Sequence, residues 1–274
     1  MTDEQLHPAV AEKIDEAIQE GGTELDLSGM MLDGVPERIR SMTDCQSLDL
    51  SNNSIHSLPE WIGELTSLQT LRLARNHFEI VPDLIQRLPK LERLTLSRNR
   101  LDALPTWLGD FRQLIALTFD HNQLESLPEW LPTFTQLREV DISGFELTQV
   151  PKWLRNFHEL EFLDVSDNWL TDLPEWLTDF ADQLTTLKIG INDLDELPAW
   201  LGQLTRLKEL NLSQLYLGSL PDWFVEFKEL ETLTLSSNQL SDLPDVVGNL
   251  TRLQTLSLNS NQLSDLPDVV GNLT

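Results

Sequence analysis

The residue types that most often carry out catalysis are few and widely separated in this chain. It has a single cysteine, Cys45, and five histidines, His7, His56, His77, His121 and His158. It contains no G-x-x-x-x-G-K-[ST] phosphate loop, no H-E-x-x-H metal motif, no C-x-x-C pair and no G-x-S-x-G elbow. His121 follows Asp120, but neighbouring strand residues face opposite ways, so this pair does not predict a metal site. We therefore expect no enzymatic activity: no catalytic residue, no cofactor and no metal ion.

Charged and aromatic side chains are better candidates for function, as parts of a recognition surface. Four arginines form an island of positive charge in an acidic chain: Arg72, Arg75, Arg93 and Arg98. The candidates that follow are acidic or aromatic for the most part: Asp120, His121, Glu139, Asp141, Phe162, Asp164, Asp167 and Trp169. Asp141 and Asp164 would repel each other if they hold one register on adjacent parallel strands about 4.8 Å apart. A partner that carries Lys or Arg, or a cation, would relieve that repulsion.

The overall charge restricts the class of partner. The formal net charge is −26 and the sequence pI is about 4.3, so the long-range field repels nucleic acids and anionic membrane surfaces. A protein or peptide with basic segments fits this charge. The N-terminus has no signal-peptide pattern, no stretch is long and apolar enough to span a membrane, and a lone cysteine forms no internal disulfide. We expect a cytoplasmic protein.

The elements that must position these side chains are set by an internal repeat. Every step between successive repeat prolines is 23 residues except the step from Pro174 to Pro198, which is 24. We expect the extra residue within Phe180–Leu184, just before a strand. The prolines of the eleven units, each after Leu or Val, are Pro36, Pro59, Pro82, Pro105, Pro128, Pro151, Pro174, Pro198, Pro221, Pro244 and Pro267.

Around each proline the unit reads L-x-x-L-x-L-x-x-N-x-L-x-x-L-P-x-x-L-x-x-L-x-x, which resembles the leucine-rich repeat. The resemblance covers Thr23 to Thr274 and implies an α/β solenoid: a curved horseshoe with a parallel β-sheet on its concave face and short helical turns on its convex face. A lone unit cannot bury its leucines, but stacked units share one core. The charged candidates named above would then point outward from the strands on the concave face. We expect about eleven repeats over residues 23–274, after an N-terminal helical cap over residues 1–22 that buries Val10, Ile14, Ala17 and Ile18 on one face.

An asparagine recurs at one position of the unit, and the resemblance implies that its side chains form a structural ladder. The members are Asn53, Asn76, Asn99, Asn122, Asn168, Asn192, Asn238 and Asn261. Met30, Phe145 and Leu215 stand at this position in three other repeats. There we expect an interrupted ladder with an apolar plug.

Seven tryptophans each lie two residues after a repeat proline, where we expect them at the border of the core on the convex side. They are Trp61, Trp107, Trp130, Trp153, Trp176, Trp200 and Trp223. We favour half-buried packing for this stripe over a role in binding a glycan or peptide. Trp169 differs, because it directly follows Asn168 and should be exposed near the rim of the strand side.

Cys45 replaces a core leucine, so we expect a buried, inert thiol.

These patterns favour a non-enzymatic scaffold that binds a partner protein or peptide on the concave face. Two alternatives stay open. The opening segment and the L-P-x-x-[IL] repeats are similar to intracellular bacterial arrays, including those of Roco-type GTPases, so the chain could be the sensing domain of a larger signalling enzyme; the tryptophan stripe could also bind a glycan or peptide. The last residues, GNLT, end in mid-repeat, and Ser237–Thr251 is identical to Ser260–Thr274, which predicts a longer native array. We expect a monomer, with end-to-end association at an uncapped C-terminal edge.

Overall fold

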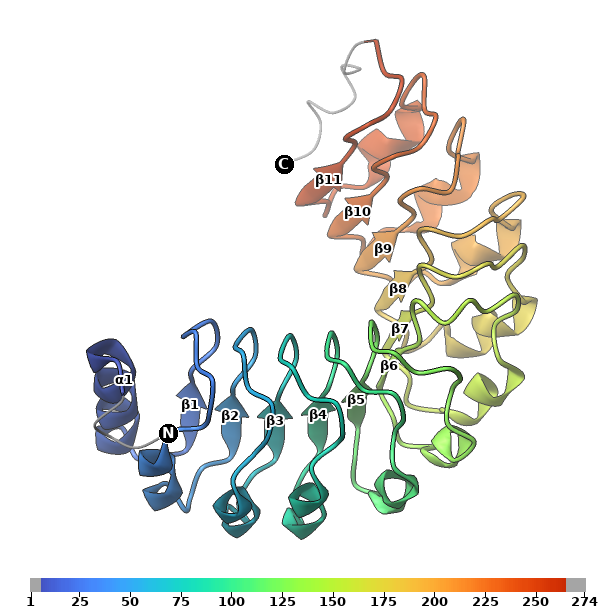
Figure 1. Ribbon diagram of the computed structural model, residues 1–274. Coiled ribbons are helices and arrows are strands. Elements are labelled where there is room, and N and C mark those ends of the chain that lie inside the picture. Colours follow the sequence, from blue (N-terminus) through green and yellow to red (C-terminus); the bar gives the residue numbers. More distant parts are fainter. Residues whose placement is uncertain (1–5, 265–274) are drawn as a thin grey trace. The chain divides into compact units, whose positions relative to one another are not determined.

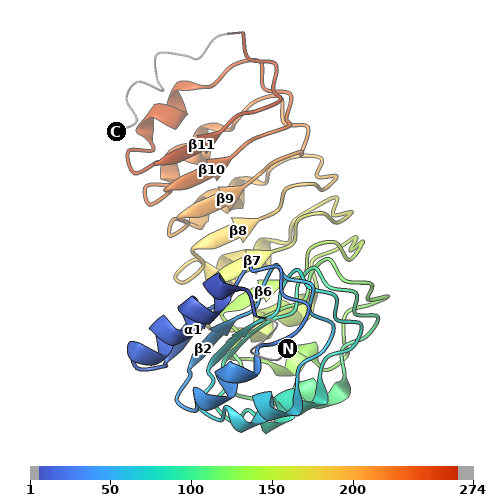
Figure 2. The same cartoon turned by 60° about the vertical axis from the view of Figure 1, so that its left-hand side comes forward.

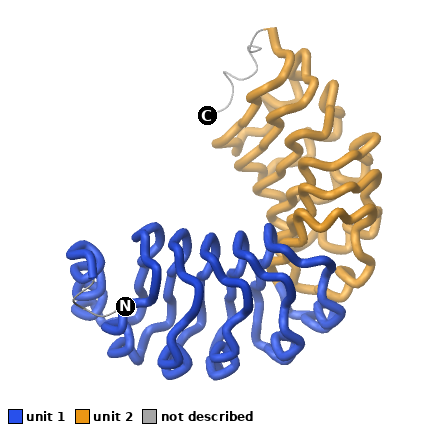
Figure 3. Tube along the Cα trace, in the orientation of Figure 1, with its two compact units in different colours: residues 1–137 blue, residues 138–274 orange. Residues whose placement is uncertain are grey.

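The computed structural model describes residues 6–264 of a chain that divides into two compact units, unit 1 (residues 1–137) and unit 2 (residues 138–274) (Figure 3). Unit 1 begins with helix α1 (Pro8–Gln19), and its repeats each contribute one strand and one short 3-10 turn (Figure 1). The strands of unit 1 are β1 (Glu24–Asp26), β2 (Ser47–Asp49), β3 (Thr70–Arg72), β4 (Arg93–Thr95) and β5 (Ala116–Thr118). Its turns are η2 (Glu37–Ser41), η3 (Glu60–Glu64), η4 (Asp83–Arg87), η5 (Thr106–Asp110) and η6 (Leu131–Thr133).

Unit 2 repeats the same plan, and Figure 2 shows its strands as a row of parallel arrows. The strands are β6 (Glu139–Asp141), β7 (Phe162–Asp164), β8 (Thr186–Lys188), β9 (Glu209–Asn211), β10 (Thr232–Thr234) and β11 (Thr255–Ser257). The turns are η7 (Lys152–Asn156), η8 (Glu175–Phe180), η9 (Ala199–Gln203), η10 (Asp222–Glu226) and η11 (Asp245–Asn249). Each unit is therefore a solenoid of the predicted α/β kind, with a parallel sheet on one side and 3-10 turns on the other.

The three-residue strands pair in chain order within each unit, and their register places like residues side by side. Leu48 pairs with Leu71 and Leu71 with Leu94 in unit 1, while Leu163 pairs with Leu187 in unit 2. These central residues are fully buried. Burying a leucine side chain stabilises the fold by about 1.5–3 kcal/mol, which explains why each repeat keeps this position apolar. We call the outward side chains of the strands the strand face, and the loop residues that flank the asparagine position the rim.

The single 24-residue repeat is accommodated before β8, where the sequence predicts the extra residue. Turn η8 has six residues where most other turns have five, and the chain continues in turn conformation through Ala181 to Gln183. Thr186 still pairs with Phe162, and Lys188 with Asp164, so the register of the sheet is unchanged. The insertion is absorbed on the turn side because that side carries no ladder of sheet hydrogen bonds.

Helix α1 lies beside β1 at the N-terminal edge of unit 1 (Figure 1). It starts at Pro8 and ends before Gly21 and Gly22, both at positive φ, as the sequence predicts. Val10 and Ile14 are buried, but Ile18 is 41% exposed, so the prediction that Ile18 packs inward is wrong. The buried face is only two turns long because the helix ends at Gln19, and Ile18 lies in its last turn. No helix among the described residues is long and apolar enough to cross a membrane.

The asparagine ladder forms, and its hydrogen bonds connect consecutive repeats. The Asn76 side-chain amide donates to the Leu73 carbonyl of its own repeat at 3.1 Å and to the Leu50 carbonyl of the preceding repeat at 2.9 Å. Its oxygen accepts from the Ile55 N–H at 3.0 Å. Loop carbonyls and N–H groups that no strand could pair are satisfied in this way. The ladder is therefore structural, and both the amide group and the oxygen of Asn76 take part in it.

Candidate functional site

The basic side chains of unit 1 occupy the strand face and the rim. Arg72 and Arg93 lie on the neighbouring strands β3 and β4, offset by two positions in the register. Arg75, Arg98 and His121 form a row on the rim, because each directly precedes a ladder asparagine in its own repeat and has a positive φ of 50–55°. Arg75 and Arg98 are exposed. This row is the most accessible group of basic side chains among the candidates in unit 1.

Asp120 is placed differently from the other candidates of unit 1. It is only 7% exposed, and its Oδ2 lies 3.9 Å from Nε2 of His121. Burial limits the surface that this carboxylate can offer to a partner. Among the described residues, no three His, Cys, Asp or Glu side chains are arranged to hold a metal ion.

In unit 2 the structure brings Asp141 and Asp164 together, directly opposite each other on β6 and β7. Each carboxylate accepts hydrogen bonds from the serine two residues on: Asp141 from Ser143 N–H at 3.0 Å, and Asp164 from Ser166 N–H at 2.9 Å. These bonds fix the turn that follows each strand. The pair therefore has a structural role beside any contact with a partner, and Asp164 is only 8% exposed.

A lysine that the sequence analysis missed completes this part of the strand face. Lys188 pairs with Asp164 in the sheet register, its Nζ lies 5.1 Å from the Phe162 ring centroid, and it forms an ion pair with Glu209 at 3.3 Å. The signal was present, because Lys188 holds the strand position of Asp141 and Asp164 one repeat later. The extra residue in that repeat shifts the numbering and hides the correspondence.

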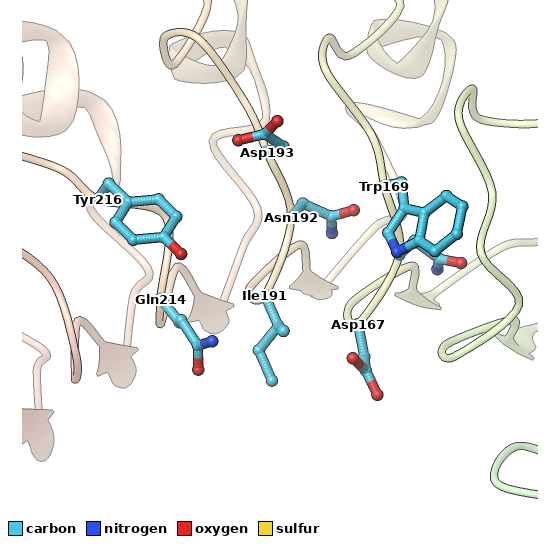
Figure 4. Close-up of a pocket in the computed structure, with 8 residues that line it drawn as sticks. Asp167, Trp169, Ile191, Asn192, Asp193, Gln214 and Tyr216 are labelled. Atoms are coloured by element: carbon cyan, nitrogen blue, oxygen red, sulfur yellow. The ribbon is translucent and has the colours of Figure 1, made fainter.

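A hollow of unit 2 lies on the rim beside Trp169, which is 59% exposed (Figure 4). The hollow encloses about 330 Å³. Its lining residues come from three consecutive repeats and are Asp167, Asn168, Trp169, Ile191, Asn192, Asp193, Gln214 and Tyr216. We call it the rim hollow. Of its members, only Asp167 and Trp169 were candidates from the sequence.

The repeat explains how these side chains meet. Trp169, Asp193 and Tyr216 each directly follow the ladder position, so they form one row across three repeats. Asp167, Ile191 and Gln214 each directly precede it and form a second row (Figure 4). An alignment of the repeats on the asparagine position would have identified both rows. Taken singly, Ile191 and Gln214 have no distinctive chemistry, so their residue types alone do not indicate a site.

The backbone around Tyr216 differs from that of a regular repeat, because Leu215 stands at the asparagine position. In a regular repeat one residue has positive φ, the one before the asparagine, as at Ile191 with 56°. In the repeat of Leu215, both neighbours have positive φ, Gln214 at 54° and Tyr216 at 57°. Tyr216 is 61% exposed, while Leu215 is 2% exposed. A non-glycine residue in this conformation is uncommon and marks a constrained loop.

The other two repeats without the asparagine share this geometry. Gly29 and Met31 flank Met30, and Gly144 and Glu146 flank Phe145, all four at positive φ. The predicted apolar plug is present only at Leu215, because Met30 and Phe145 are half-buried. At Phe145 and at Leu215, the asparagine of the next repeat bridges the gap in the ladder. Asn168 accepts a hydrogen bond from the Phe145 N–H at 3.1 Å, and Asn238 accepts one from the Leu215 N–H at 3.0 Å.

The seven repeat tryptophans lie at the border of the core on the turn side. Trp61 is 8% exposed and the other six are half-buried. Trp153 packs on Phe157 with ring centroids 5.4 Å apart, and Trp223 packs on Phe227 at 5.9 Å. A Cβ added to Gly109 would meet Trp130 at 3.0 Å, so that indole lies directly on the glycine of the preceding repeat. The indoles thus close the seam between repeats, and this packing favours the structural interpretation of the stripe.

Cys45 is fully buried, and burial raises the pKa of its thiol to about 11. Its Sγ donates weakly to the Ser47 carbonyl at 3.4 Å. A thiol that stays protonated at neutral pH and has no access to solvent is a poor nucleophile. The prediction of a buried cysteine is confirmed.

Comparison with known proteins agrees with this architecture. Three family models match: "Leucine-rich repeat region" over residues 24–198, "Leucine rich repeat" over residues 182–240, and "Leucine Rich repeats (2 copies)" over residues 228–271. No curated protein has a significantly matching sequence.

Three solved structures illustrate the range of similar proteins. A leucine-rich-repeat protein of Leptospira interrogans has 25% identity and a TM-score of 0.53, with 94% of this chain and 90% of that chain covered. An internalin of Listeria monocytogenes has 20% identity and a TM-score of 0.59, with 97% and 93% covered, and shows the fold alone. The Arabidopsis receptor kinase HAESA, in complex with the peptide hormone IDA and the co-receptor SERK1, has 25% identity and a TM-score of 0.64, with 88% and 46% covered.

Proposed function

Because the chain belongs to the leucine-rich-repeat family, whose fold is commonly a protein-interaction module, we propose that it is a non-enzymatic scaffold that binds a partner protein or peptide. The partner contacts the strand face and the rim. This surface is the concave face of the horseshoe that the sequence predicts, and its candidate residues are the charged and aromatic ones described above. Stacked repeats suit this role, since they present an extended row of side chains on a rigid frame.

The observation that carries the proposal is the contrast between the two sides of each strand. The inward side chains are buried and nearly all leucine, whereas the outward ones vary in charge from repeat to repeat. Packing of the core does not require this variation in charge, whereas recognition of a specific partner requires it. The peptide complex of the similar HAESA receptor supports the class of ligand. The net charge of −26 favours a partner with basic segments.

Three further parts of the proposal concern organisation and location. Helix α1, within residues 1–22, acts as the N-terminal cap of a repeat array over residues 23–274. The scaffold works in the cytoplasm, because the single buried cysteine suits a reducing compartment. It works as a monomer, with end-to-end association of arrays as a secondary mode.

A selection followed by charge reversal tests the proposal. Peptides that bind the chain are selected from a random display library, and their dissociation constants are measured by calorimetry. We expect the double variant Arg75→Glu/Arg98→Glu, or the variant Glu139→Lys, to weaken the selected peptides at least tenfold. The matched controls are Arg87→Glu and Lys152→Glu, which reverse exposed charges on the turn side.

The opposite pattern contradicts the proposal. If the turn-side reversals abolish binding and the strand-face reversals leave it unchanged, recognition lies on the turn side. If no peptide or protein ligand can be selected at all, the scaffold has another function.

A further inference from the structure

We propose that the rim hollow of unit 2 binds the guanidinium group of an arginine side chain presented by a peptide. This inference rests on the proposed function and names the chemical group that one part of the surface recognises. It is carried by three properties of the hollow: its exposed apolar side chains, its charge, and the absence of a basic partner for Asp193 among the described residues.

The hollow gathers an unusual share of the exposed apolar surface. Among the described residues of unit 2, three large hydrophobic side chains are exposed: Trp169 at 59%, Ile191 at 40% and Tyr216 at 61%. All three line this one hollow (Figure 4). Exposed apolar groups that cluster are typical of an interaction site, whereas scattered ones are not.

The spacing of the repeats sets the width of the site. Trp169 and Tyr216 lie two repeats apart, so their backbones are separated by about 10 Å at about 4.8 Å per strand. Ile191 and Asp193 of the intervening repeat lie between them (Figure 4). One extended side chain fits across this span, with its methylene groups over Ile191 and its planar end against an aromatic ring. Arginine stacks on aromatic faces in this way and lysine does so less well.

The charge of the hollow selects a cation. Asp167 and Asp193 are exposed members of the lining, and none of the eight lining residues is basic. The neighbouring Lys188 is engaged by Glu209 at 3.3 Å and by the Phe162 ring. Within the described part of the chain, no basic side chain forms an ion pair with Asp193. Two carboxylates beside aromatic rings match the donors and the charge of a guanidinium group.

The remaining polar groups of the hollow argue against a neutral ligand. The Asn192 amide donates to the Val165 and Ile189 carbonyls at 3.0 and 2.9 Å, and its oxygen accepts from the Leu170 N–H at 3.0 Å. Asn168 is committed to the ladder in the same manner. Of the amide side chains in the lining, Gln214 alone is left for a neutral ligand such as a sugar, and such a ligand would leave the charges of Asp167 and Asp193 uncompensated. We infer a cation-binding site and treat a glycan as an outcome of the test.

The experiment uses Nα-acetyl-arginine amide as the probe and Nα-acetyl-citrulline amide as its neutral, nearly isosteric control. NMR spectra of the chain monitor the indole N–H signal of Trp169 and the methyl signals of Ile191. We expect saturable shifts of both signals with the arginine probe, at millimolar concentration. The citrulline probe is expected to bind at least fivefold more weakly.

Two variants keep the test specific. Asp193→Asn removes one charge without changing the shape of the side chain, and we expect it to weaken the arginine probe at least threefold. Tyr216→Gly removes the ring at a position where φ is 57°, which glycine adopts readily, so we expect weaker binding with an unchanged urea midpoint. The control is Asp182→Asn, which removes an exposed charge of unit 2 outside the hollow. It should bind the probe like the parent chain.

Equal binding of the arginine and citrulline probes would overturn the inference, as would stronger binding of maltose, a neutral disaccharide, at the same signals. These results are separable from the proposed function. If the arginine probe leaves the hollow unaffected while selected peptides still depend on Arg75, Arg98 or Glu139, the scaffold function holds and this inference alone fails.

Discussion

The molecule uses tryptophan in two contrasting regions, the turn-side seam and the rim of unit 2. On the turn side, the indoles are buried or half-buried: Trp153 and Trp223 pack on phenylalanines, and Trp130 lies on Gly109 of the preceding repeat. On the rim, Trp169 is 59% exposed beside two carboxylates. Position within the repeat, and not residue type, decides which use occurs. The contrast separates side chains that stabilise the fold from those available for a partner.

The largest expected effect compares one tryptophan from each region of the same unit. Trp223→Ala removes a ring that stacks on Phe224 at 4.9 Å and packs on Phe227, so we expect it to lower the free energy of unfolding by about 2–4 kcal/mol. Trp169→Ala should change it by less than about 0.5 kcal/mol, as for other exposed sites. Urea unfolding measures both. Equal losses for the two variants would remove the distinction between seam and rim.

The second prediction concerns the glycines on which the seam closes. Gly109→Ala places a methyl group 3.0 Å from Cβ and Cγ of Trp130, atoms too close to the backbone to move aside easily. We expect a loss of about 1–3 kcal/mol from overpacking. Gly202→Ala is the matched control, since its added Cβ would meet Trp223 at 3.4 Å, an ordinary contact distance. The tight seam is contradicted if urea unfolding finds Gly109→Ala as stable as Gly202→Ala.

The contrast between buried and exposed side chains also applies to ionisable groups, and Cys45 is a buried one. Its pKa is raised to about 11 by burial, so the unfolded chain loses the thiol proton at lower pH than the folded chain does. The contribution of this group to stability is therefore fully present below pH 9 and is lost as the pH rises towards 11. We expect no reaction with a thiol reagent at pH 8 in the native state, and full reaction in denaturant. Rapid native labelling would show that the site opens to solvent.

The smallest effect is expected at an exposed carboxylate, Asp26, at the end of β1. The Ser28 side chain and N–H hydrogen-bond the Asp26 carboxylate and lower its pKa below 3.8. A depressed pKa means that this bond stabilises the folded chain above the ordinary pKa and is lost as the pH falls through the folded value. Ser28→Ala should raise the Asp26 pKa towards 3.8 in an NMR titration, with little change in stability at pH 7. A pKa unchanged by the substitution would assign the shift to the backbone N–H at position 28, or to Lys13 and Arg72, and not to the serine hydroxyl.

The sequence predicted some of the tertiary detail through position in the repeat. It predicted that Trp169 is exposed and that the seven other tryptophans lie at the border of the core, because every copy of a position meets the same local environment. It failed where a side chain depends on a particular neighbour. Ile18 was expected to be buried, Met30 and Phe145 were expected to plug the core, and Lys188 was overlooked beside Phe162.

The repeat by itself determined the strands, the turns, the asparagine ladder and the leucine core, because these recur within one unit and follow from hydrophobic alternation, proline geometry and amide hydrogen bonding. Only the tertiary structure decided which side chains share the rim hollow. Trp169, Ile191 and Tyr216 come from three repeats, one of them lengthened by a residue, and they meet because stacking restores the register. Tyr216 also has a left-handed backbone conformation, which its own residue type does not predict.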